Sequence, residues 1–102
     1  MEYLVVLCTC SEAEAPDLAR SLLDERLIAC SNLSTMTSLY TWKEAVEEAR
    51  ETLLIMKTTE ERWPALRDRI EELHSYDMPE ILALPVTDGA ARYLAWLGGV
   101  VE

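Results

Sequence analysis

Phenylalanine is absent from this chain of 102 residues, histidine occurs once and glycine three times. From one histidine and three glycines, no Ser-His-Asp set, no recognisable frame of paired carboxylates and no dinucleotide fingerprint can be assembled. Basic residues are also scarce, since nine stand against nineteen acidic ones for a net charge of -10. Such a charge repels phosphate backbones and anionic membrane surfaces. The sequence therefore predicts neither an enzyme nor a protein that binds nucleic acid or membranes.

The N-terminus, MEYLVVLCTC, has no basic lead, and its apolar run is too short for a signal peptide or a membrane span. Three cysteines, an odd number, argue against a disulfide framework and for reduced thiols. We therefore expect a cytoplasmic protein. The length predicts a single domain that covers residues 1–102.

An internal repeat organises the chain. The stretch LVVLCTCSEAEAPDLARSLL from Leu4 is matched by TLLIMKTTEERWPALRDRIE from Thr52. Each copy opens with an apolar run suited to a buried strand, then has Ser11 or Thr59 as the expected helix N-cap, then apolar residues at helical spacing. A further strand follows each helix, LIACSNL after the first and EILALPV after the second. The order β-α-β, twice, predicts an α+β, ferredoxin-like split β-α-β sandwich with Pro85 on an edge strand.

A long hairpin is expected between the two halves. STMTSLYTW is rich in strand-forming residues, the polar tip is predicted at residues 43–45, and the return strand runs from Val46 to Lys57. Arms of about a dozen residues would reach roughly 40 Å. A short C-terminal helix is predicted after Asp88 and Gly89. The hairpin should thus project beyond the body of a domain of this size.

The predicted strands are apolar on both faces, as in LVVL and LLIM, yet two helices cover only one face of a four-stranded sheet. A face without its own helix, together with the projecting hairpin, favours an oligomer. Tyr40 and Trp42 share one side of their strand. We assign both to a subunit interface in preference to a platform for stacking a ligand.

Six stretches resemble a known family in order and spacing: VVLCT, LIACSNL, TSLYTWK, LLIMKTT, PEILALPV and YLAWL. Over essentially its full length the chain resembles the CutA family of divalent-cation tolerance proteins. The resemblance implies a homotrimer with a ferredoxin-like fold, an architecture similar to that of the PII signalling proteins, and a link to copper binding and the response to metal ions. The chain departs from the family at Glu44, where glycine is usual, and at residues 73–76, where LHSY replaces a pattern with His-Pro-Tyr.

Cys8, His74 and Glu80 are the candidate metal ligands, because the predicted topology brings them to one edge of the sheet. Thiolate and imidazole suit copper, and a carboxylate suits harder divalent ions. The resemblance implies copper binding at the positions of Cys8 and His74. The structural alternative is that Cys8 is a small buried hydrophobe and that His74 faces the negative end of its helix. We expect Cys10 to point to the face opposite Cys8 and Cys30 to pack in the core.

The leading hypothesis is a trimeric, non-enzymatic cation-tolerance protein that binds copper or other divalent metal ions. The alternative is a PII-like signalling or scaffold trimer that binds a small ligand or a partner protein in the clefts between subunits. An acylphosphatase-like enzyme ranks last. The turn CTCSEAEAP is acidic and contains neither the glycine nor the arginine that a phosphate-binding loop would need.

Overall fold

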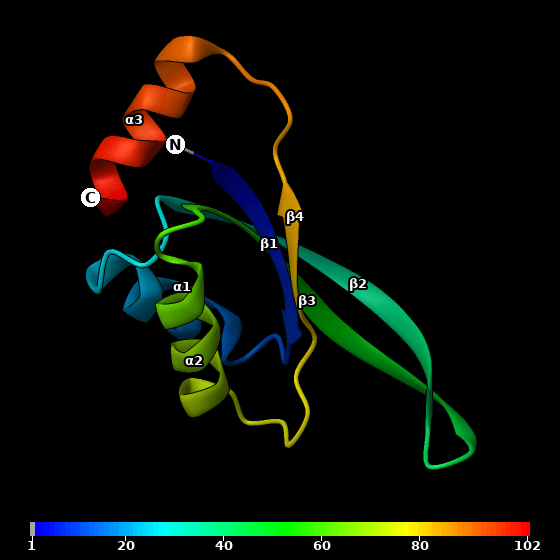
Figure 1. The fold of residues 1–102 in the computed structure, drawn as a ribbon. Coiled ribbons are helices and arrows are strands. Elements are labelled where there is room, and N and C mark those ends of the chain that lie inside the picture. The colour runs from blue at the N-terminus through cyan, green and yellow to red at the C-terminus, as the bar shows by residue number, and fades with distance from the viewer. Residues whose placement is uncertain (1) are drawn as a thin grey trace.

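The computed structural model describes residues 2–102. Within this range the elements are β1 (Tyr3–Cys10), α1 (Ala15–Asp24), β2 (Cys30–Trp42), β3 (Ala45–Thr59), α2 (Trp63–Leu73), β4 (Ile81–Pro85) and α3 (Ala91–Val101). The strands form one antiparallel sheet in the order β2-β3-β1-β4, with the first strand of each half at its centre (Figure 1). The predicted α+β, ferredoxin-like split β-α-β sandwich is confirmed, and Pro85 ends an edge strand.

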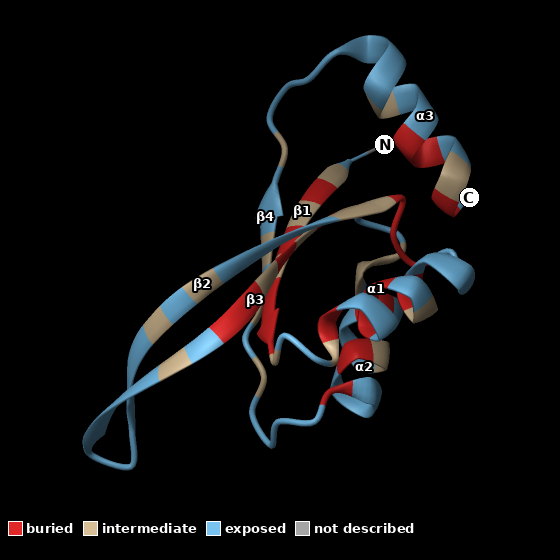
Figure 2. Cartoon of the chain, turned by 180° about the vertical axis from the view of Figure 1, so that it is seen from behind, coloured by how far each residue is buried: buried red, intermediate tan, exposed pale blue. Residues whose placement is uncertain are grey.

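One face of the sheet packs against α1 and α2. Alternate residues of the two central strands point toward these helices and are fully buried, among them Val6 of β1 and Leu54 and Met56 of β3. They join Leu22 of α1 and Ile70 of α2 in the main hydrophobic core. In Figure 2 buried residues lie on the central strands and on the two helices that pack against them. The period-two pattern of the strands therefore fixes which side chains reach the core.

Both of these helices begin later than their expected caps. Ser11 and Thr59 were expected as N-caps, but α1 begins at Ala15 and α2 at Trp63, after a turn in each case. Proline is the second residue of both helices, where its missing N–H has no intrahelical partner to lose. Ser11 still accepts a hydrogen bond from the backbone N–H of Glu14, so it caps the turn that leads into α1.

The hairpin of β2 and β3 projects from the body as predicted. Its ladder runs from the pair Cys30 and Lys57 to the pair Trp42 and Ala45, and the longest dimension of the molecule is 44 Å against 25 and 22 Å for the other two. The residues at the tip, Lys43 and Glu44, both have positive φ, 49° and 69°. Two such residues in a two-residue loop match the twist of antiparallel strands, although glycine and asparagine adopt this conformation more easily.

The second face of the sheet carries a helix at one end, which corrects the expectation of a face without one. Leu97 and Val101 of α3 are buried against Ala29, and Tyr3 packs on the same cluster. A helix of 11 residues spans only about 16 Å, so it leaves most of the face uncovered. We call the remainder the open face, which consists of Val5, Leu7, Leu53, Ile55, Leu82 and Leu84. Among residues 2–102, no helix is long and apolar enough to cross a membrane.

Candidate functional site

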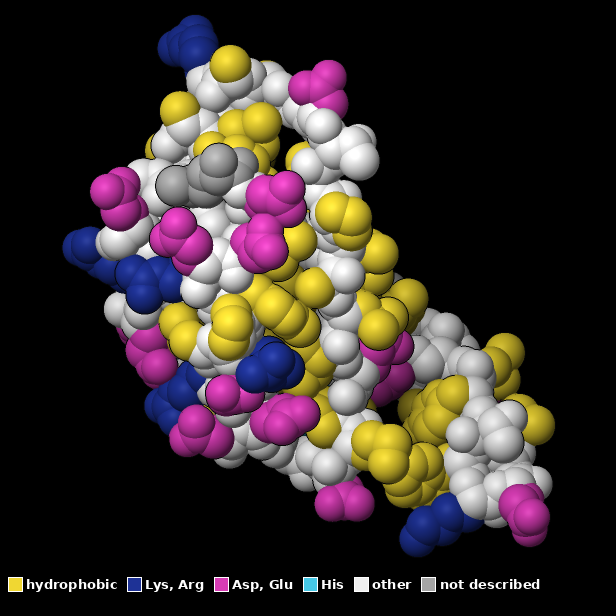
Figure 3. All heavy atoms as spheres, viewed as in Figure 1, with side chains coloured by type: hydrophobic (Ala, Val, Ile, Leu, Met, Phe, Trp, Pro, Cys, Tyr) yellow, Lys and Arg dark blue, Asp and Glu magenta, His cyan; other side chains and the backbone are white. Residues whose placement is uncertain are grey.

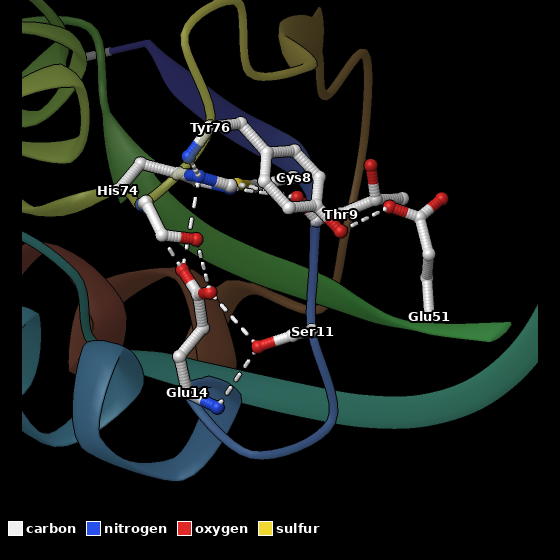
Figure 4. A network of polar contacts seen from close by, with 8 residues as sticks. Cys8, Thr9, Ser11, Glu14, Glu51, His74 and Tyr76 are labelled. Atoms are coloured by element: carbon white, nitrogen blue, oxygen red, sulfur yellow. Dashed lines mark hydrogen bonds and ion pairs between the residues drawn. The ribbon is translucent and has the colours of Figure 1, made fainter. Parts of the chain in front are cut away.

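His74 lies where α2 ends, and its side chain is 0% exposed. Its Nε2 atom is 2.8 Å from the backbone carbonyl oxygen of Thr9, and its Nδ1 atom accepts a hydrogen bond of 3.0 Å from the backbone N–H of Tyr76 (Figure 4). Because Nδ1 is an acceptor, a neutral imidazole carries its proton on Nε2 and donates it to Thr9. Both ring nitrogens are therefore occupied within the protein.

The partner of His74 follows from where β4 begins. In the antiparallel ladder between β1 and β4, Cys8 pairs with Ile81, the first residue of β4, so Thr9 lies one residue beyond the ladder. A backbone carbonyl at such a position needs another donor when it is buried. The imidazole of His74 supplies that donor in place of a further strand residue. The only histidine thus completes the edge of the sheet.

Cys8 contacts the same carbonyl oxygen. Its Sγ atom is 3.7 Å from the carbonyl oxygen of Thr9, and its side chain is buried in the main core. Burial, and then the negative charges of neighbouring groups including Glu80, raise the pKa of the Cys8 thiol to about 12. At neutral pH this sulfur is a thiol and not the thiolate that binds metals. The structure brings Cys8 and His74 together on one oxygen atom.

Glu80 stands apart from this pair. It lies just before β4, is exposed, and lines a cavity on the side of the open face with Tyr76 and Glu51, whereas Cys8 points toward the helices. In the part of the chain that the structure describes, no three His, Cys, Asp or Glu side chains are grouped so that they could hold one metal ion. The three candidate ligands are therefore close in the fold but do not converge.

The other two cysteines differ from expectation. Cys10 shares a face with Cys8 and is buried in the same core, because residues two positions apart in a strand point the same way. Burial, followed by the charges of Glu14 and Glu51, raises the pKa of Cys10 to about 11. Cys30 is half-buried outside the core, with its Sγ atom 3.6 Å from the hydroxyl of Tyr93 on α3. All three thiols are free.

Glu14 anchors the segment that follows α2, a role that our sequence reasoning missed. Its carboxylate accepts hydrogen bonds from the Ser75 hydroxyl at 2.5 Å, the Ser75 N–H at 3.3 Å and the Ser11 hydroxyl at 2.8 Å, and it lies 3.7 Å from Nδ1 of His74. Burial acts to raise the pKa of Glu14, but these hydrogen bonds outweigh it and lower the pKa. The Ser-x-x-Glu spacing of a capping box was the available signal.

A second carboxylate, Glu51, holds the same segment from the hairpin. The hydroxyl of Tyr76 donates a 2.9 Å hydrogen bond to Oε2 of Glu51, and burial together with this bond raises the pKa of Tyr76 above its usual range. A cavity of about 720 Å³ opens between the projecting half of the hairpin, residues 36–42, and residues 76–80. Nothing in the sequence distinguishes Glu51 from Glu47 and Glu48, so this position was not predicted.

The chain is similar to known proteins over nearly its whole length. Residues 4–99 match the family model described as CutA1 divalent ion tolerance protein. The chain is 44% identical over 98 residues to the divalent-cation tolerance protein CutA of Thermus thermophilus, with 95% of each chain covered. It is 47% identical to the protein of the same name from Salmonella newport, with 94% of this chain and 85% of the relative covered.

Solved structures agree with this likeness. CutA1 from Oryza sativa superposes with a TM-score of 0.96 at 36% identity, with 100% of this chain and 95% of that chain covered. The protein from Archaeoglobus fulgidus, described as a periplasmic divalent cation tolerance protein CutA, gives a TM-score of 0.95 at 34% identity over 98% and 99% of the two chains. The chain therefore belongs to the CutA1 divalent ion tolerance family.

Proposed function

We propose that the protein is a non-enzymatic homotrimer that binds copper or other divalent ions in the cytoplasm and takes part in the response to metal ions. Its relatives are named divalent-cation tolerance proteins and not enzymes. The net charge of -10 attracts cations, and three free cysteines suit a reducing compartment.

One observation supports the metal proposal. The Cys8 sulfur and the His74 Nε2 atom both contact the carbonyl oxygen of Thr9. Sulfur together with imidazole nitrogen is the ligand set that copper prefers. An ion bound through Nε2 must displace the thiol proton of Cys8 and the Nε2 proton of His74, which moves to Nδ1. The imidazole then loses its hydrogen bonds to Thr9 and from Tyr76. We therefore expect weak binding that strengthens as the pH rises, because metal and proton compete for the sulfur.

Glu80 is the proposed third ligand. Because it now lies on the cavity side, it can join the other two only if residues 74–80 rearrange. The hydrogen bonds of Ser75 to Glu14 and of Tyr76 to Glu51 hold that segment in place. Their loss would accompany metal binding.

Titration of the metal-free protein with copper, under reducing conditions, tests this site. Cys8→Ser and His74→Gln should each weaken binding by about tenfold or more. Glu80→Gln should have a smaller effect, and Cys30→Ser, which removes a thiol elsewhere, should have none. If Cys8→Ser and His74→Gln both bind copper as the parent does, the site is wrong.

The trimer proposal rests on the uncovered apolar surface. The open face presents leucines such as Leu82, which is 53% exposed, and the hairpin adds Tyr40 and Trp42. In Figure 3, hydrophobic side chains gather on the projecting hairpin and along the adjoining side of the body. Exposed apolar patches of this extent usually mark contacts between proteins. Sedimentation equilibrium at micromolar concentration should give three times 11.6 kDa, and a monomer mass would contradict the proposal.

A further inference from the structure

We propose that the cavity between the projecting half of the hairpin, residues 36–42, and residues 76–80 binds a small organic amine in its ammonium form, with Glu51 as the group that holds the charge. The cavity shares Glu80 and residues 76–80 with the proposed copper site, so amine binding is tested without copper. Its volume of about 720 Å³ is within the range of roughly 300–1,000 Å³ that is common for small-molecule sites.

Glu51 is the anchor of the site. The residue is only 5% exposed, yet it lines the cavity. One carboxylate oxygen accepts the hydrogen bond of Tyr76, and among residues 2–102 the other oxygen has no hydrogen-bond partner. A carboxylate oxygen that is free and faces the cavity can pair with a donor or an opposite charge from solution. An ammonium group supplies both.

The remaining walls suit the body of such a ligand. Tyr40 and Trp42 line the cavity from the hairpin, and Met78 lines it from the opposite segment. Aromatic faces attract cations, and aromatic and thioether groups also pack against apolar carbon. Asp77 and Glu80 add two acidic side chains, and the described lining contains neither lysine nor arginine. The chemistry therefore selects a cation with an apolar body and rejects anions.

A bare metal ion fits this cavity less well. Metal ions need several ligand atoms within about 2.0–2.6 Å. The carboxylates of the cavity are spread along its walls, since no three acidic, cysteine or histidine side chains in the described part of the chain are grouped around one point. An organic cation can meet them at separate positions. Figure 3 shows the hollow where the hairpin leaves the body, open to a ligand from solution.

Titration of the purified full-length protein with 2-phenylethylamine hydrochloride, followed by calorimetry, tests the proposal. The neutral isostere 2-phenylethanol should bind at least about tenfold more weakly, because it lacks the charge that Glu51 would pair with. Glu51→Gln should weaken amine binding by about tenfold and leave binding of the alcohol unchanged. Glu71→Gln, which removes an exposed carboxylate from α2, is the matched control and should change neither.

A second variant guards against misfolding of Glu51→Gln. Glu80→Gln alters an exposed side chain of the cavity and should weaken amine binding by about two- to threefold. The proposal is overturned if the alcohol binds as tightly as the amine, if Glu80→Gln and a folded Glu51→Gln both bind like the parent, or if no amine binding is seen at about 10 mM. Tighter binding of Nα-acetyl-lysine methylamide would also overturn it, because the occupant would then be a lysine of another protein.

Discussion

At the scale of single residues, His74 has a structural role that its hydrogen bonds define. The sequence left it open between a metal ligand and a residue at the negative end of a helix, and the repeat correctly predicted the edge of the sheet at which it lies. Its partners could not be predicted. They depend on β4 beginning at Ile81, which leaves the carbonyl of Thr9 to be satisfied by the residue that follows α2. That register is set by tertiary packing and not by any local pattern.

Replacement of His74 by Ala should lower the free energy of unfolding by about 2–4 kcal/mol even without metal. The change leaves the Thr9 carbonyl and the Tyr76 N–H without partners and opens a cavity in a buried position. Urea denaturation in the presence of a chelator is the measurement. His74→Gln, which keeps one donor, should lose less. Equal metal-free stability of parent and His74→Ala would mean that these hydrogen bonds contribute nothing.

The cysteines should differ sharply in their reaction with iodoacetamide. Burial holds the pKa of Cys8 at about 12 and that of Cys10 at about 11, so neither forms appreciable thiolate at pH 8. Cys30 is half-buried and reachable from solvent. Mass spectrometry of the native protein should therefore find the label on Cys30 alone, with the other two labelled only after denaturation. Labelling of Cys8 as fast as Cys30 would show that the thiol is activated or the core opens readily.

Secondary-structure elements were predicted better than their boundaries and contacts. The repeat gave the strand order and the two helices because it reflects the apolar periods of 2 and 3.6 residues. The helices begin three residues later than predicted. In α1 this is because Ser11 caps a turn and not the helix itself. The position of α3 was not predicted either. Leu97 and Val101 define an apolar stripe, but a stripe does not say which surface it covers.

Arg26→Gly should stabilise the protein by about 0.5–1 kcal/mol through the end of α1. The N–H groups of Arg26 and Leu27 bond back to the carbonyls of Leu23 and Leu22, which is the Schellman arrangement, and Arg26 adopts a φ of 57° that glycine accepts without a steric penalty. The greater freedom of glycine in the unfolded chain offsets part of the gain.

The matched control for this prediction lies within the same helix. Arg20→Gly should cost about 1 kcal/mol, because the middle of α1 has ordinary helical backbone and glycine is a poor helix former there. Thermal unfolding of both variants and the parent should show a higher melting temperature for Arg26→Gly and a lower one for Arg20→Gly. A lower melting temperature for Arg26→Gly would mean that its side chain contributes more than the strained backbone costs.

At the scale of the whole molecule, the hairpin takes part in both the proposed trimer and the proposed amine site. It extends the molecule to 44 Å and presents Tyr40 and Trp42 next to the cavity and to the open face. A trimer built on the open face would place another subunit beside the mouth of the cavity. The cavity would then become a cleft between subunits, still lined by Glu51 and Tyr76 from one chain. Assembly and amine binding should therefore influence one another.

Trp42→Ala is the change that separates these roles. If Trp42 anchors the trimer, its removal should weaken assembly by about 2 kcal/mol or more, the usual threshold for an aromatic hot spot, as measured by sedimentation equilibrium. Leu23→Ala on α1 removes a side chain with nearly the same exposure, 39% against 38%, from the helix side of the molecule, and should leave the mass unchanged. A Trp42→Ala protein that stays trimeric with unaltered stability, but binds 2-phenylethylamine more weakly, would assign Trp42 to the cavity and leave the open face as the surface that holds the subunits together.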